Sequence, residues 1–248
     1  MDSVSFDRIA DRYDDTRGGI DRGRRFAAVI DPFLEPGDDL LEIGVGTGVI
    51  AQPLQTLGHH VIGIDLSREM LSRSRDRVES VVEGDATRLP FASERFDAVV
   101  AVWAVHLIGD FDALIDEVDR VMRPGSPLLV VSSTPDVEPN DLSDIAFRFG
   151  KALGRGRDRS RYLVDRLTPH GFTHETDVAT DEHDFEESPM DRAAMIERRD
   201  WSSLWDLDDS AWRRVVQPVI DDLRALPEPD RPRRCLHRHI LSVYRGPS

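Results

Sequence analysis

The sequence contains a single cysteine and no long apolar run, and each scarcity excludes a class of protein. With Cys235 as its only cysteine, the chain has no internal disulfide and no cysteine-based metal cluster. The longest apolar run, from about Ala98 to Ile108, is shorter than the roughly 20 residues of a membrane-spanning helix. No basic stretch followed by an apolar one stands at the start, so no signal peptide is expected. These features predict a cytoplasmic protein without a membrane span.

Positive charge is scarce relative to negative charge. The chain has 32 basic residues against 47 acidic ones, which gives a net charge of −15. This balance repels phosphate backbones, so we expect no nucleic-acid partner. The 248 residues, 40% of them hydrophobic, suffice to bury one sizeable core. The sequence therefore predicts a single globular domain, and its oligomeric state cannot be predicted from these features.

Strand-like and helix-like stretches alternate through the first half of the chain. Short apolar runs predict strands at 39–43, 60–64, 81–82, 97–103 and 127–132, and amphipathic stretches predict helices at 49–57, 67–78 and 111–122. This alternation is typical of βαβ units, so it predicts a mostly parallel α/β sheet with helices on both faces. Further elements are expected as two helices within 1–35, helices at 142–153 and 162–167, a strand at 172–178, mainly helix at 191–226 and a last strand at 235–244.

Three glycines, Gly44, Gly46 and Gly48, lie where the first predicted strand passes into the next helix. Glycine lets a backbone approach a ligand closely, and ligands of open α/β sheets bind at the carboxyl ends of the strands. The dinucleotide fingerprint Gly-x-Gly-x-x-Gly needs its third glycine at position 49, where this chain has Val49. With Glu42 before the turn, the spacing favours a nucleoside ligand held without a pyrophosphate.

Acidic residues follow the next two strands. Asp65 ends the second strand, where a carboxylate accepts hydrogen bonds from ribose hydroxyls; the alternative is that Asp65 is an N-terminal cap for the helix that starts at Ser67. Asp85 follows the third strand, where it can accept from an adenine amino group while the Ala86 N–H donates to the ring. The alternative for Asp85 is a local Asx turn.

Together these residues resemble the class I S-adenosylmethionine-dependent methyltransferases, in the methyltransferase type 11 branch that contains the ubiquinone- and menaquinone-biosynthesis C-methyltransferases. The resemblance covers about residues 6–132, is most specific over 40–91, and includes four further segments at 61–71, 88–91, 96–103 and 121–125. It implies a Rossmann-like seven-strand sheet whose last strand is antiparallel. It also implies S-adenosyl-L-methionine as cofactor, S-adenosyl-L-homocysteine as product, and in-line methyl transfer to oxygen, carbon or nitrogen of a small molecule.

A domain layout follows from the same resemblance. Residues 1–248 are expected to form a single methyltransferase domain, with N-terminal helices at 1–35 and a cofactor-binding core at 36–134. A helical insertion or lid is expected at 184–231, between the last two strands.

The resemblance gives the motif residues roles around the cofactor. The methionine part is expected at Gly44, Gly46 and Gly48, with its amino group at Glu42 and the ribose at Asp65. The remaining expected contacts are Leu66 and Met70 beside the adenine, Asp85 and Ala86 at its edge, Val102 and Trp103 near the sulfonium, and Tyr13 and Arg17 closing over the cofactor, with Arg17 on its carboxylate. The alternatives are core packing for Tyr13 and a solvated charge for Arg17.

The sequence excludes some classes of methyl acceptor and leaves the identity of the acceptor open. After the fourth predicted strand the chain reads Val-Trp-Ala-Val-His, without the Asp/Asn-Pro-Pro-aromatic segment of methyltransferases that act on DNA or glutamine amino groups. Cytosine-C5 enzymes need a cysteine there, and Cys235 lies far downstream. His106 is the candidate general base, required only where the acceptor loses a proton; the alternative is a packing role.

Aromatic residues gather in the C-terminal third. Trp201 and Trp205 stand four residues apart, and Trp212 follows seven residues later. They predict either an aromatic wall for an apolar or aromatic acceptor, or a helical cap that buries its own core. No histidine spacing indicates a metal site. Two other functions stay compatible with the sequence: a nicotinamide-dependent oxidoreductase on a similar sheet, and a non-catalytic methyltransferase-like binding protein.

Overall fold

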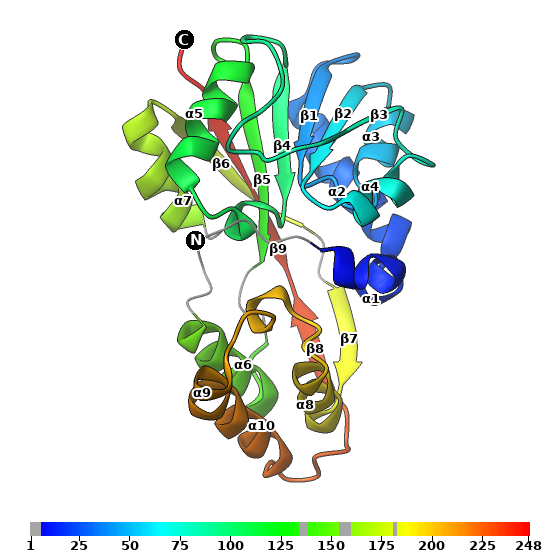
Figure 1. Cartoon of the computed structure of the whole chain (residues 1–248), viewed down its shortest axis with the longest axis vertical. Helices are drawn as coiled ribbons and strands as arrows, with labels where there is room; N and C mark the ends of the chain where they lie inside the picture. Colours follow the sequence, from blue (N-terminus) through cyan, green and yellow to red (C-terminus); the bar gives the residue numbers. More distant parts are fainter. Residues whose placement is uncertain (1–5, 134–137, 154–159, 181–182) are drawn as a thin grey trace. The chain divides into compact units, whose positions relative to one another are not determined.

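The structure is a computed structural model that describes residues 6–133, 138–153, 160–180 and 183–248 (Figure 1). The chain divides into two compact units. The first consists of Met1–Ser132, Asp158–Thr180 and Ile240–Ser248, and the second of Ser133–Arg157 and Asp181–His239. None of the described helices is long and apolar enough to cross a membrane.

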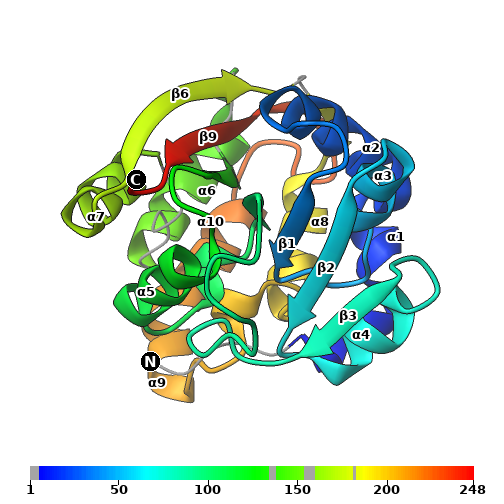
Figure 2. The same ribbon diagram turned by 90° about the horizontal axis from the view of Figure 1, so that it is seen from above.

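The first unit contains a seven-stranded sheet in the order β3-β2-β1-β4-β5-β9-β6. Its strands are β1 (Asp39–Ile43), β2 (His60–Asp65), β3 (Ser80–Glu83), β4 (Ala98–Val102), β5 (Pro127–Ser133), β6 (Thr173–Ala179) and β9 (His239–Arg245). The pairs β1–β2, β1–β4, β2–β3 and β4–β5 are parallel, whereas β9 runs antiparallel to β6. Figure 2 shows β1, β2 and β3 side by side and β6 next to β9. This arrangement confirms the predicted fold class.

Helices cover both faces of the sheet, so consecutive residues of its central strands are buried. Leu40 of β1 packs on the side of α2 (Gly19–Ile30) and α3 (Ala51–Thr56). Leu41 packs on the opposite side, against α5 (Phe111–Val121) and α7 (Ser160–Leu167). A strand buried on both faces needs apolar residues in succession, as in β4, which reads Ala-Val-Val-Ala-Val; β1 follows this pattern at Leu40, Leu41 and Ile43 but includes the buried Glu42.

The N-terminal part begins as a 3-10 helix, Asp7–Arg12, and continues as α1 (Tyr13–Arg17) and α2. After β2, the helix α4 (Arg68–Ser74) has Ser67 as its N-cap, and the Ser67 hydroxyl accepts a hydrogen bond from the Met70 N–H at 3.1 Å. Ser67 therefore satisfies one of the free N–H groups at the start of this helix. The helix ends four residues before the predicted Val78.

The second unit has its own core and its own small sheet. Its helices are α6 (Asp141–Ala152), α8 (Pro189–Glu197), α9 (Asp209–Ala211) and α10 (Gln217–Arg224), and β7 (His183–Glu187) pairs antiparallel with β8 (Arg233–His237). Leu142, Phe149 and Ile220 are buried together in its core. The predicted last strand at 235–244 is two strands, because β8 pairs within this unit and β9 pairs with β6. The insertion predicted at 184–231 falls inside this unit, which also includes residues 133–157.

Candidate functional site

The loop between β1 and α3 turns through three glycines with positive φ angles, +70° at Gly44, +55° at Gly46 and +80° at Gly48. An added Cβ at Gly44 would lie 2.6 Å from the Cβ of Ala104, and one at Gly48 would lie 2.7 Å from Cγ2 of Val78. At Gly46 the nearest atom would be 4.0 Å away. Packing therefore requires glycine at positions 44 and 48, whereas the Gly46 backbone borders open space where a ligand can approach.

The carboxylate of Glu42 is buried beside this loop. Glu42 is 1% exposed, and its Oε2 atom has no hydrogen-bond partner among the described residues. Burial, reinforced by the nearby carboxylate of Asp65, raises the pKa of Glu42 well above its ordinary value, although a hydrogen bond from the Ala51 backbone opposes the shift. An unpartnered buried carboxyl oxygen is costly, so this position suits a ligand that brings a hydrogen-bond donor or a positive charge.

Asp65 connects the glycine loop to the start of α4. Its Oδ2 accepts the N–H of Gly46 at 2.9 Å, and its Oδ1 accepts the N–H of Ser67 at 2.8 Å. Burial raises the pKa of Asp65, and these two hydrogen bonds oppose the rise. Asp65 therefore contacts the backbone just before α4, although the N-cap of that helix is Ser67. Each carboxylate oxygen has a second lone pair, so Asp65 can still accept a hydrogen bond from a ribose hydroxyl.

The residues predicted around the adenine occupy neighbouring loops. Asp85 Oδ1 accepts from both the N–H and the hydroxyl of Thr87, each at 2.9 Å, which is the local turn proposed as its alternative. Ala86 is buried, Leu66 is exposed, and Met70 is fully buried behind the start of α4. Leu66 therefore offers an accessible apolar surface, whereas the Met70 side chain is enclosed in the core.

The Arg22 guanidinium lies against the ring of Trp103, the residue that follows β4, and this pair has two further aromatic rings as neighbours. Trp103 follows the last residue of β4 with a φ of +52°, and its ring meets Phe26 edge-on at 5.0 Å. The Arg22 guanidinium lies 4.6 Å from the centre of the Trp103 ring and 5.7 Å from that of Tyr13. A left-handed φ is strained for a bulky residue, so the packing around Trp103 must hold it there. Tyr13 thus contacts Arg22, in addition to Phe6, which its ring meets edge-on at 6.1 Å.

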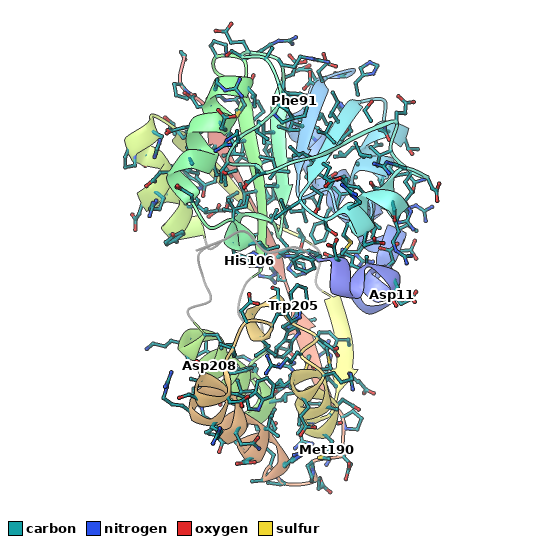
Figure 3. The ribbon with its side chains drawn as sticks, viewed as in Figure 1. Asp11, Phe91, His106, Met190, Trp205 and Asp208 are labelled. Atoms are coloured by element: carbon teal, nitrogen blue, oxygen red, sulfur yellow. The ribbon has the colours of Figure 1, made fainter. Side chains whose placement is uncertain are left out.

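The remaining predicted site residues are His106, Arg17 and Val102. His106 is exposed in the 3-10 helix Val105–Leu107 that follows β4. Figure 3 shows it at the same end of the first unit as Asp11 of the N-terminal helices. Arg17 ends α1, and its side chain lies outside the described residues. Val102, the last residue of β4, is buried.

The sequence did not indicate the polar residues that connect the N-terminal helices to the proposed site. Asp14 binds Thr47 of the glycine loop, Asp7 binds Ser67, and Arg22 stacks on Trp103. These partners are far apart in the chain, and no spacing in the sequence pairs them.

The three tryptophans of the second unit do not share a helical face. Trp201 is extended, with φ −109° and ψ 135°, and precedes the short 3-10 helix Ser202–Leu204; Trp205 follows that helix. Trp201 packs against Phe149, while Trp205 donates its ring N–H to the Arg199 carbonyl at 2.7 Å. Trp201 and Trp212 are partly buried against the core of the second unit, which favours the interpretation as a cap that buries its own core. Within the described residues, no group of His, Cys, Asp or Glu is arranged to hold a metal ion.

Comparison with known sequences identifies related proteins. Residues 41–130 match the profile of a family described as a methyltransferase domain. A demethylmenaquinone methyltransferase of Mycobacterium sp. (strain JLS) is 41% identical over 173 residues, which cover 65% of this chain and 75% of the relative.

Solved structures show the same fold at low identity. A putative methyltransferase from Bacillus halodurans C-125 superposes with a TM-score of 0.59 and 20% identity, covering 93% of this chain and 100% of its own. The Haemonchus contortus phosphoethanolamine N-methyltransferase 2, in complex with phosphomonomethylethanolamine and S-adenosylhomocysteine, gives a TM-score of 0.55 and 20% identity, covering 99% of this chain and 61% of its own.

Proposed function

Since this chain belongs to the class I S-adenosylmethionine-dependent methyltransferases of the ubiquinone and menaquinone type, we propose that the small molecule it methylates is a quinol-type aromatic ring. The chain is an enzyme, and its family transfers methyl groups. The quinol is supported by the Mycobacterium relative, which is named a demethylmenaquinone methyltransferase and is 41% identical. A cytoplasmic location is part of the same proposal.

The buried Glu42 carboxylate carries the assignment of the donor site. Its Oε2 is unpartnered among the described residues, and its charge is close to that of Asp65, which accepts the Gly46 N–H of the glycine loop. S-adenosylmethionine brings an ammonium group and a sulfonium, so the residues present fit this cofactor: a buried carboxylate gains a counter-ion when the cofactor binds. Glu42 then holds the ammonium group, and Asp65 holds the ribose with its remaining lone pairs. The other proposed contacts are Tyr13, Arg17, Gly44, Gly46, Gly48, Leu66, Met70, Asp85, Ala86, Val102 and Trp103.

The reaction requires positioning more than acid–base chemistry. When bound, the cofactor supplies an electrophilic methyl group on its sulfonium. Holding an acceptor in line with that group accounts for much of the rate in a direct displacement. Val102 and Trp103 end β4 with apolar and aromatic surface, which orients a flat ring and keeps water out. A ring carbon of a quinol becomes nucleophilic when a hydroxyl loses its proton, and the exposed imidazole of His106 is the proposed acceptor of that proton.

Calorimetric titration tests the donor assignment. We expect the purified protein to bind S-adenosylmethionine and S-adenosylhomocysteine and not NADH. Asp65→Ala is expected to weaken S-adenosylhomocysteine binding about 10- to 100-fold, the scale of lost charge-assisted hydrogen bonds. Binding of NADH alone would overturn the donor site. A methyl-transfer assay with a short-chain 1,4-naphthoquinol and a catechol tests the acceptor, and methylation of only the catechol would contradict the quinol.

A further inference from the structure

The helix α1 is fastened to the glycine loop by Asp14. The hydroxyl of Thr47, a residue only 1% exposed, donates to Asp14 Oδ1 at 2.5 Å. Arg77, beyond the end of α4, lies 2.6 Å from Asp14 Oδ2 and donates to the Thr47 carbonyl at 3.0 Å. The three residues therefore form a closed ring of polar contacts that joins three separate segments.

The same N-terminal helices reach the next loop through Asp7. Asp7 Oδ1 accepts the hydroxyl of Ser67 at 2.5 Å and the N–H of Glu69 at 3.3 Å. Asp65, the proposed ribose ligand, is close enough that the Asp7 charge contributes to raising the pKa of Asp65, after the larger effect of burial. Asp7 and Asp14 thus hold the ends of the segment 7–14 on two different loops of the proposed site.

The position of Thr47 makes its contact with Asp14 important for the loop. Thr47 stands between Gly46 and Gly48, two glycines with positive φ, and glycine loses more conformational freedom on ordering than any other residue. A loop of this kind has many accessible conformations unless other contacts restrict it. A site whose competent conformation is only partly populated binds its ligand more weakly by that fraction.

We propose that Asp14 is a positioning residue: with Arg77 it holds Thr47 and orders the glycine loop for the methionine part of the cofactor. The inference rests on the proposed function, because it assigns that part of the cofactor to this loop. Asp7 acts on the loop of α4, which belongs to the adenosine part. The N-terminal helices therefore contact the two halves of the cofactor site through two different carboxylates.

Two ligands separate these halves in a binding experiment. S-adenosylhomocysteine has both the adenosine and the amino-acid part, whereas 5′-methylthioadenosine lacks the amino acid. We expect Asp14→Ala to weaken S-adenosylhomocysteine about tenfold, as for one charge-assisted hydrogen bond, and to change the Kd of 5′-methylthioadenosine less than about twofold. Thr47→Val, which keeps the side-chain shape and removes the hydroxyl, is expected to give the same selective loss.

The neighbouring Asp15→Ala is the matched control, because Asp15 is an exposed acidic residue of the same helix. It is expected to bind both ligands as the unmodified chain does. Circular dichroism establishes that each variant is folded. An equal loss for both ligands in Asp14→Ala, or no loss in Asp14→Ala and Thr47→Val, overturns the role of Asp14 while leaving the proposed function intact. Failure of the unmodified chain to bind S-adenosylhomocysteine overturns the proposed function and the inference together.

Discussion

Single residues of the glycine loop serve two different requirements, packing and ligand access. Gly44 is surrounded, since a Cβ there would lie 2.6 Å from that of Ala104, whereas Gly46 borders open space. The pattern of glycines in the sequence is the same at both positions. Only the structure separates a glycine that packing requires from one that borders open space.

Gly44→Ala is expected to lower the free energy of unfolding by about 2–4 kcal/mol, because it adds both a steric clash and a strained positive φ. Combining it with Ala104→Gly removes the clash and should recover about half of that loss. Gly46→Ala should lower stability by only about 1 kcal/mol and weaken cofactor binding. Urea denaturation measures the first two effects and calorimetry the last. Equal destabilisation by both alanines would contradict this division.

The buried Glu42 predicts a stability that depends on pH. Its raised pKa means that the folded state keeps a proton that the unfolded state has already released, so stability is full below the ordinary glutamate pKa and is lost as pH rises towards the folded value. Glu42→Gln removes this loss. We expect the variant to melt about 2–4 °C above the unmodified chain at pH 7, corresponding to roughly 1 kcal/mol, with the difference vanishing near pH 4.

The cofactor reverses this advantage. Glu42→Gln is expected to bind S-adenosylmethionine more weakly, since it lacks the charge that pairs with the ammonium group. Melting curves from pH 4 to pH 8, with and without S-adenosylhomocysteine, measure both effects. A Gln variant less stable than the unmodified chain at pH 7 without ligand would show that the Glu42 charge stabilises the fold.

Local motifs in the sequence were enough to predict that the glycine loop, Asp65 and Asp85 lie at the carboxyl ends of β1, β2 and β3, which is where the structure places them. Their contacts with the cofactor stay a prediction. The same information could not show that Thr47 meets Asp14 or that Arg22 stacks on Trp103. Those contacts join segments far apart in the chain, and they depend on how α1 and α2 lie over the sheet.

At the scale of elements, α2 is placed by a close approach to the loop after β1. A Cβ on Gly23 would lie 1.6 Å from the Val49 carbonyl oxygen, so the helix backbone passes directly against the start of α3. Amphipathic periodicity predicted the helix itself. It could not predict the close approach of α2 to the backbone at Val49, because a hydrophobic pattern does not distinguish glycine from other non-apolar positions.

Gly23→Ala is therefore expected to destabilise the protein by about 3 kcal/mol, because either α2 or the backbone at Val49 must move. Arg24→Ala, one residue along the same helix and exposed, should change stability by no more than about 0.5 kcal/mol. Thermal or urea unfolding compares the two. A mild effect of Gly23→Ala would mean that α2 can shift without loss of packing.

Sequence periodicity also failed at the last predicted strand. Residues 235–244 alternate well enough to suggest one strand, but β8 ends at His237 and β9 begins at His239. The strands pair with different partners, β7 and β6, in different units. Periodicity records which side chains are apolar and carries no information on which strand each will pair with.

At the scale of the whole molecule, the two units divide the four tryptophans unequally. Trp103 belongs to the first unit, and Trp201, Trp205 and Trp212 belong to the second. The proposed cofactor site lies entirely within the first unit. Intrinsic fluorescence can therefore report on the two units separately.

We expect S-adenosylhomocysteine to change the fluorescence of the unmodified chain and to leave that of Trp103→Phe unchanged, because Trp103 lies at the end of β4 beside the proposed site. Calorimetry establishes that the variant still binds the ligand. Trp205→Phe is the matched control and should retain the full signal change. A signal that survives in Trp103→Phe would place the responding tryptophan in the second unit.

The position of β6 at the edge of the sheet has a consequence for synthesis on the ribosome. Its neighbour is β9, and residues 180–238 are translated between the two, which takes ~3–12 s at about 5–20 residues per second. During that interval β9, the strand with which β6 pairs, has not yet been synthesised. An apolar strand in that state invites aggregation, but β6 reads Thr-His-Glu-Thr-Asp-Val-Ala and keeps alternate residues exposed even when folded. The polar sequence of β6 therefore reduces aggregation during the time before β9 is synthesised.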